Sequence, residues 1–317
     1  MRTPRRWWRV LRRILVGVFF SAVAVLLFRY ARGVQWDQVA DAMLAYQAVT
    51  IACVVALALT SHLSYAGFDL LARAYAGHKL GPLRTLAIAA VCYAFNVNLG
   101  ALVGGVAFRY RLYSRFGLRA GTVAQVYVFA VVTNWSGYVL LLGAVLTPRL
   151  VAVPAQWEIG VTASQALGAL LLLAAGAYLA VCVFLPGRRW TVRGYRVPLP
   201  RPRTALLQFA VSSANWMLMA LIFYLLLHRE VDYPTVLGTL LLAAVAGAMA
   251  HIPAGLGVLE GVFLLMLSDR VPEHRIIAAM LAYRAAYYLL PLLLALVMYP
   301  LLEAGATRRA QRASDAA

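Results

Sequence analysis

Long apolar runs dominate this sequence, and short arginine clusters separate most of them. A helix that crosses a bilayer needs about 20 apolar residues. Charged residues make up only 13% of the chain, against about 25% in soluble domains. The chain is therefore predicted to be an all-α, polytopic membrane protein. The candidate runs cover 14–28, 48–71, 85–108, 122–147, 161–185, 204–227, 235–268 and 276–302.

The basic residues give a net charge of +18, but they do not indicate a nucleic-acid partner. They lie in clusters between the apolar runs, which is the pattern that keeps basic loops in the cytoplasm and attracts anionic headgroups. Six arginines between Arg2 and Arg13 precede the first run, and no small-residue cleavage site closes that run. We expect this run to be retained as a first span.

Two of the runs are interrupted by residues that break helices. Run 85–108 contains an asparagine pair and a glycine pair, and run 235–268 is too long for one span and is broken at 251–257. At glycine and proline, backbone N–H and C=O groups lose their partners within the helix, and lipid cannot replace those partners. Such breaks therefore occur in re-entrant hairpins and broken transporter helices. We predict two re-entrant hairpins. Their predicted turn residues are Gly104, Gly105, Pro253, Gly255 and Gly257.

The distribution of basic residues tests this topology. With two hairpins and a cytoplasmic N-terminus, the cytoplasmic segments hold 22 lysines and arginines and the external loops hold 6. If run 85–108 crossed only once, the arginine-rich segments 109–121 and 186–203 would both lie outside, against the positive-inside rule. We therefore predict about six full spans, two hairpins and both termini in the cytoplasm of a bacterial inner membrane.

This arrangement predicts an inverted-topology repeat. The first hairpin enters from the cytoplasm and the second from outside, so their breaks would meet near the midplane as a substrate site. The first repeat is expected at about 14–147 and the second at about 161–302, within a single domain 1–303 followed by a basic tail 304–317. The alternative is that both breaks are kinks in packed helices.

Three motifs in order carry a resemblance to a known family. They are GGVAFRYRLYSRFGL at 104–118, HIPAGLGVLEG at 251–261 and YRAAYYLLP at 283–291. Together they resemble the lysylphosphatidylglycerol synthase transmembrane family, over roughly 10–303. Ala254 departs from the glycine that this family commonly has after its proline.

The resemblance implies a lipid translocase that moves a phospholipid between leaflets. Family members of the resistance-factor type move aminoacylated phosphatidylglycerol and carry a soluble synthase domain, which we do not expect here because only a short tail follows Glu303. The expected partners are anionic or aminoacylated phospholipids. A second copy of the chain or a separate lipid synthase are further partner hypotheses. The alternatives are an embedded lipid-modifying enzyme that uses His251 and Glu260, and a non-catalytic scaffold.

The candidate site residues are polar side chains near the breaks. Arg284 lies deep in the last run, where a lone charge costs ~2.5–3.5 kcal/mol or more, so we predict that it pairs with Glu260. The pair either grips a lipid phosphate or joins hairpin to span. Asp69 is expected to pair with Arg73. The other predicted lipid-binding residues are Asn96, Asn98, Arg109, Arg111, Arg115, His251, Tyr283, Tyr287 and Tyr288.

Each of these residues also has a structural interpretation. Arg109, Arg111 and Arg115 either collect headgroups at the cytoplasmic surface or only orient the chain. The tyrosines line a groove or pack between helices, and the asparagines contact headgroups or satisfy exposed carbonyls. No phosphate-binding loop, metal-ligand spacing or nucleophile arrangement occurs, so no cofactor or metal is predicted. Cys53, Cys92 and Cys182 are expected to be buried apolar residues.

Overall fold

The computed structural model describes residues 32, 34–151, 160–185, 189–192, 195–250, 252 and 255–315. Within them the chain is helical except for one short β-hairpin, and seven helices are long and apolar enough to cross a membrane. The prediction of a polytopic helical membrane protein is confirmed. The predicted first span, 14–28, lies outside the described residues.

In chain order the elements are α2 (Trp36–Leu44), α3 (Ala48–Ala76), α4 (Pro82–Leu99), η1 (Ala101–Ala107), α5 (Phe108–Arg115), α6 (Ala120–Leu146), α7 (Val161–Phe184), β1 (Arg189–Val192), β2 (Tyr195–Pro198), α8 (Pro202–Leu226), α9 (Tyr233–Ala250), α10 (Val258–Leu267), α11 (Glu273–Tyr283), η4 (Arg284–Leu289) and α12 (Leu290–Asp315).

Local sequence explains where these helices begin and end. Pro82 and Pro202 occupy the first turns of α4 and α8, where the missing N–H of proline would have no partner in any case. Gly77 ends α3 in the left-handed conformation, with φ 68°, which glycine adopts without steric cost.

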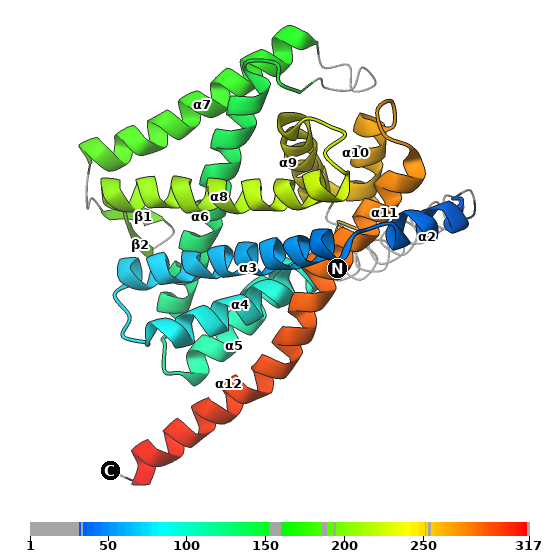
Figure 1. Cartoon of the computed structure of the whole chain (residues 1–317). Helices are drawn as coiled ribbons and strands as arrows, with labels where there is room; N and C mark the ends of the chain where they lie inside the picture. The colour runs from blue at the N-terminus through cyan, green and yellow to red at the C-terminus, as the bar shows by residue number, and fades with distance from the viewer. Residues whose placement is uncertain are drawn as a thin grey trace, which may run out of the picture.

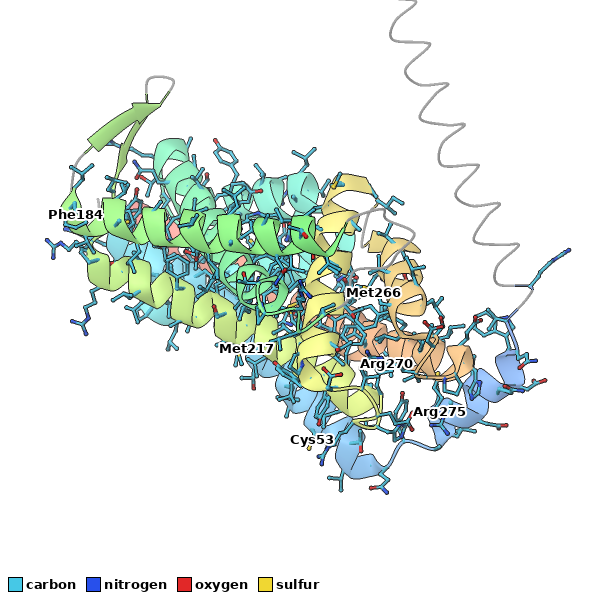
Figure 2. The ribbon with its side chains drawn as sticks, turned by 90° about the horizontal axis from the view of Figure 1, so that it is seen from above. Cys53, Phe184, Met217, Met266, Arg270 and Arg275 are labelled. Atoms are coloured by element: carbon cyan, nitrogen blue, oxygen red, sulfur yellow. The ribbon has the colours of Figure 1, made fainter. Side chains whose placement is uncertain are left out.

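Helices α3 and α8 form the centre of the molecule and pack most extensively against each other, with α6 against both (Figure 1). The crossing of α6 and α8 is close at Gly137, where a Cβ would overlap Ser212 and Ser213. Helix α7 covers the outer side of α6. Of the three cysteines, Cys92 and Cys182 are buried, but Cys53 is exposed on α3 (Figure 2), so the prediction of burial is wrong for Cys53.

The first broken run folds into a helical hairpin. Its turn lies at Gly100, with φ 83°, and the π-helix η1 and α5 return along α4. The predicted turn at Gly104 and Gly105 is therefore wrong. Both glycines lie in the returning arm and are buried. A methyl group on Gly104 would overlap the backbone of Phe95 and Asn96, so this glycine permits the close approach of the two arms.

The second broken run is also a hairpin, formed by α9 and α10, which pack against each other. Gly255 and Gly257 lie in its turn with φ 59° and 80°, and the predicted turn residue Pro253 lies outside the described residues. Both turn glycines adopt the left-handed conformation that disfavours other residues.

The last helix is continuous from Glu273 to Asp315 and contains the π-helical segment η4. The predicted tail at 304–317 does not start at a break, because α12 continues through it to Asp315. In both halves of the chain a long helix, a hairpin and another long helix follow one another, which is the order that an inverted repeat requires. The repeat boundaries stay a prediction.

The turns lie at two opposite ends of the molecule. The α3–α4 turn and the β1–β2 hairpin share one end with the terminus of α12, and α2 and the start of α11 share the other (Figure 1). Figure 2 shows the same separation, with Phe184 at one end and Arg270 and Arg275 at the other. This agrees with the two groups of segments that charge assigned to opposite sides of the membrane.

Candidate functional site

A cavity of about 330 Å³ lies between the two hairpins. Its wall includes Asn96 from the first hairpin, Leu259 from the second, and Trp216 from α8. A volume of this size falls at the lower end of the range for small-molecule sites, about 300–1,000 Å³. The two breaks in the chain therefore meet at one cavity, as an inverted repeat predicts.

The described part of the cavity wall is mainly apolar and also carries aromatic and amide side chains. Trp216 and four tyrosines supply the aromatic surface, and two asparagines supply amide groups. No lysine, arginine, aspartate or glutamate is among the described residues that line it. The tyrosines are Tyr65, Tyr93, Tyr283 and Tyr288, and the asparagines are Asn96 and Asn134.

A chain of hydrogen bonds runs from the cavity wall into the protein. Tyr93 bonds Tyr287 at 2.9 Å, Tyr287 bonds Ser61 at 3.0 Å, and Ser61 donates to Asn215 Oδ1 at 2.8 Å. The amide oxygen only accepts, so the single hydroxyl proton of Ser61 is donated to Asn215. Tyr287 must then donate to Ser61, and Tyr93 must donate to Tyr287. The Tyr93 oxygen is left as an acceptor.

His62 lies beside this chain, with ring centroids 4.9 Å from Tyr93 and 4.6 Å from Tyr287. Its Nδ1 bonds the carbonyl of Ala58 at 3.0 Å. A carbonyl only accepts, so the proton of neutral His62 is on Nδ1. Its Nε2 is buried without a hydrogen-bond partner among the described residues.

The predicted pairing of Arg284 with Glu260 is confirmed. Arg284 Nε and Nη2 each lie 2.6 Å from Glu260 Oε1, while Glu260 Oε2 accepts the N–H of Gly257 at 2.8 Å. Glu260 therefore caps α10 and also holds the last helix. The Arg284 guanidinium lies 5.2 Å from the ring centroid of Tyr288, so the pair stands directly behind the cavity wall without lining it.

Tyrosines 283, 287 and 288 take different places. Tyr283 and Tyr288 line the cavity, whereas Tyr287 is buried in the hydrogen-bond chain. Asn96 lines the cavity, but Asn98 donates to the carbonyls of Ala94 and Tyr288 at 2.8 and 3.2 Å. Asn98 thus satisfies one carbonyl of α4 and one carbonyl of the π-helix η4, in agreement with its structural interpretation.

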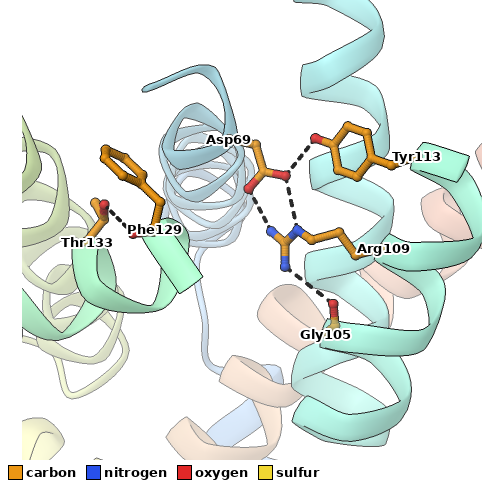
Figure 3. A network of polar contacts seen from close by, with 6 residues as sticks. All are labelled: Asp69, Gly105, Arg109, Tyr113, Phe129 and Thr133. Atoms are coloured by element: carbon orange, nitrogen blue, oxygen red, sulfur yellow. Dashed lines mark hydrogen bonds and ion pairs between the residues drawn. The ribbon is translucent and has the colours of Figure 1, made fainter. Parts of the chain in front are cut away.

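Arg109 is not at the surface where the sequence predicted it. Its side chain is 2% exposed, and its Nη2 and Nε bond the two oxygens of Asp69 at 2.7 and 3.1 Å (Figure 3). Tyr113 donates to the same carboxylate at 2.7 Å. The expected pairing of Asp69 with Arg73 is therefore wrong, and Arg73 instead donates to the carbonyl of Leu80 at 2.6 Å.

The other two arginines of the RYRLYSR segment are exposed. Arg111 pairs with Glu303 at 2.6 Å, and Arg115 lies one turn further along the same helix. Arg111 and Arg115 share one face of α5, and Arg111 contacts α12 through Glu303. Of the predicted site residues, His251 lies outside the described residues.

A second cavity, of about 260 Å³, joins the α3–α4 turn to the α5–α6 turn. Lys79 and Arg119 give it a basic wall. Burial, together with the nearby Arg73, lowers the pKa of His78 in the same wall, so this imidazole is neutral at pH 7. Because both ends of the first hairpin meet here, the hairpin returns to the side from which it started.

Several residues of the site could have been found from the sequence. Ser61, Tyr65 and Asp69 interrupt an apolar run at intervals of four, so they share one face of a helix. That spacing is a signal for a buried polar stripe. Asn215 and Tyr93 have no comparable pattern, because their importance depends on the packing of α8 and α4 against α3.

Residues 14–295 match the family described as the lysylphosphatidylglycerol synthase transmembrane region. The chain belongs to this family. It is 44% identical to the inner membrane protein YbhN of Escherichia coli over 95% of both chains. It is also 30% identical to an uncharacterized protein of Synechocystis sp. over 88% of both chains.

The match to family members with a named activity is shorter. The phosphatidylglycerol lysyltransferase of Staphylococcus haemolyticus is 37% identical over 92 residues, which are 28% of this chain and 11% of that enzyme. This chain thus matches YbhN over nearly its whole length, and the lysyltransferase over 92 residues only.

Proposed function

We propose that this protein is a lipid translocase that moves a phospholipid between the two leaflets of a bacterial inner membrane. The observation that supports the proposal is the cavity between the two helical hairpins, whose mainly apolar wall also carries tyrosine hydroxyls and asparagine amides. Such polar groups inside a helical membrane domain give a headgroup hydrogen-bond partners that hydrocarbon lacks. At about 330 Å³ the cavity has room for a headgroup, while the acyl chains would stay in the surrounding lipid.

The engagement of Glu260 supports translocation over embedded catalysis. Both of its oxygens are occupied, one by Arg284 and one by the N–H of Gly257. A general base must lie within hydrogen-bond reach of the proton that it abstracts, and Glu260 is not among the described residues that line the cavity, so it is placed to hold the second hairpin.

Reconstitution in liposomes tests the proposal. The purified protein is added to vesicles that contain fluorescent phospholipids, and leaflet exposure and lipid composition are both measured. A translocase changes the exposed fraction without making a new lipid. Formation of a new lipid species would instead indicate an embedded lipid-modifying enzyme. If neither leaflet exposure nor lipid composition changed, only the hypothesis of a non-catalytic scaffold would remain.

We also propose that the basic turns face the cytoplasm. Single cysteines at Ser114, in α5, and at Thr191, in β1, test this orientation in a cysteine-free background. Both should resist impermeant thiol reagents in intact cells and react after the membrane is opened. Labelling of either position from outside would contradict the proposed orientation.

A further inference from the structure

We propose that the cavity selects a phospholipid whose headgroup is net neutral and carries an ammonium group, as an ethanolamine phospholipid does. The inference rests on the translocase function proposed above and names the class of lipid. It follows from two features of the cavity: the balance of charge around it, and the direction of the hydrogen bonds in its wall.

The charges nearest the cavity are already neutralised. Arg284 is paired with Glu260, and Arg109 is paired with Asp69. The described lining residues contribute no further lysine, arginine, aspartate or glutamate. A headgroup with a net charge would enter without a counter-charge, and an unpaired charge in a low-dielectric site is strongly disfavoured. A zwitterionic headgroup brings its own counter-charge.

The hydrogen-bond chain supplies the preference for an ammonium group. Because Ser61 donates to Asn215 Oδ1, every proton of the hydrogen-bond chain is directed toward Asn215 and the Tyr93 oxygen is left to accept. An ammonium group has three donors and no acceptor, whereas phosphate oxygens only accept and a glycerol hydroxyl offers a single donor. Tyr93 therefore complements the ammonium end of the headgroup.

Amide groups in the same wall complement the phosphate end. Asn96 on α4 and Asn134 on α6 both line the cavity, and each side-chain amide has two N–H donors. Acceptor and donors thus occur on the same wall, which fits a headgroup that carries both signs of charge and does not fit one that carries only a phosphate.

The selectivity is measured with three fluorescent phospholipids in otherwise identical proteoliposomes. Their headgroups are ethanolamine (net neutral), glycerol (net negative) and lysylglycerol (net positive). We expect the ethanolamine lipid to be translocated at least about tenfold faster than either charged lipid. Equal or faster translocation of a charged lipid would overturn the selectivity and leave the translocase function intact.

A variant separates the hydrogen-bond argument from general damage to the fold. In Ser61→Ala, Tyr287 loses its acceptor and can donate only to Tyr93, which frees the Tyr93 proton to turn toward the cavity. We expect the ratio of ethanolamine to glycerol lipid rates to fall about three- to tenfold, the size of one hydrogen bond. A lower translocation rate with an unchanged ratio of the two lipid rates would overturn the role of the hydrogen-bond chain in selectivity.

Ser64→Ala is the matched control, because Ser64 lies on the same helix as Ser61 but is not part of the hydrogen-bond chain. Its hydroxyl donates to the carbonyl of Val211 on α8 at 3.5 Å. This variant should leave the ratio unchanged. If no lipid is translocated, the proposed function fails, and the selectivity is tested separately by binding. Short-chain ethanolamine lipid should then raise the melting temperature of the purified protein more than short-chain glycerol lipid does, and the opposite order would overturn it.

Discussion

The two hairpins are tied to the rest of the protein in different ways. In the first, Arg109 on the returning arm is 2% exposed and bonds both oxygens of a fully buried Asp69. In the second, Glu260 on the returning arm is 24% exposed and binds Arg284 through one oxygen. A buried charge that loses its partner costs far more than a partly hydrated one, so the first hairpin is the more firmly anchored.

The packing of the arms shows the same difference. Gly104 in the first hairpin faces the backbone of α4 with no room for a Cβ, whereas a Cβ on Gly255 in the second would meet none of the described residues within 4 Å. Closely packed segments open at a higher free energy than loosely packed ones. The first hairpin is therefore the more tightly packed wall of the cavity among the described residues.

The largest expected effect comes from breaking the buried pair. Arg109→Leu should lower the free energy of unfolding by ~3–5 kcal/mol, because it leaves Asp69 charged and buried without its cation. Thermal unfolding in detergent measures the loss. The double variant Asp69→Leu with Arg109→Leu should recover much of it, since no unpaired charge remains. A cost for Arg109→Leu no larger than that for Glu260→Gln would contradict the difference between the hairpins.

Glycine variants compare the packing of the arms. Gly104→Ala should destabilise by ~1–3 kcal/mol because the arms must separate. Gly255→Ala should cost ~1–2 kcal/mol or less, from its left-handed φ alone. Gly176→Ala is the reference variant for the change in stability, because a Cβ on Gly176 in α7 would meet none of the described residues within 4 Å. Gly168 also lies in an uninterrupted span but is unsuitable, because a Cβ there would overlap Thr147 and Leu146.

Variants of Arg284 test how the ion pair of the second hairpin affects lipid transport. Arg284→Ala should abolish transport while the protein still inserts and folds, because Glu260 then faces the cavity region without its cation. Arg284→Lys should restore part of the rate, since a single ammonium replaces the two nitrogens that now lie 2.6 Å from Glu260. Leaflet exposure in proteoliposomes is the measurement. A Lys variant as active as the parent would show that the guanidinium geometry is unimportant.

The smallest effect is expected at the surface. Arg111, two residues from Arg109, is 56% exposed and pairs with Glu303 on α12. Exposed ion pairs are screened by water and salt. Arg111→Ala should therefore leave the melting temperature and the transport rate unchanged within error. A clear drop in either would show that α5 and α12 depend on this pair.

Charge distribution and backbone-breaking residues were enough to predict much of this fold. The arginine clusters separate 109–121 and 186–203 from the loops that are predicted to be external, and the glycines of both broken runs indicate where hairpins occur. The pairing of Glu260 with Arg284 also followed, because a lone charge deep in a span needs a partner and few candidates were near.

The partner of Arg109 could not be chosen in the same way. Asp69 had a neighbour at the favourable spacing of four, Arg73, and nothing in the sequence states that the returning arm of the first hairpin packs against α3. The turn of that hairpin was misplaced for a related reason. Glycine marks both a turn and a close helix contact, and only the packing of η1 on α4 separates Gly100 from Gly104.

The pairing of charges also bears on the membrane potential. A single charge that moves across the whole membrane does about 2.3 kcal/mol of electrical work per 100 mV. Arg284 and Glu260 are bonded to each other, so within any movement of the second hairpin together with the last helix this pair carries equal and opposite charges. The membrane potential therefore does no net electrical work on the pair.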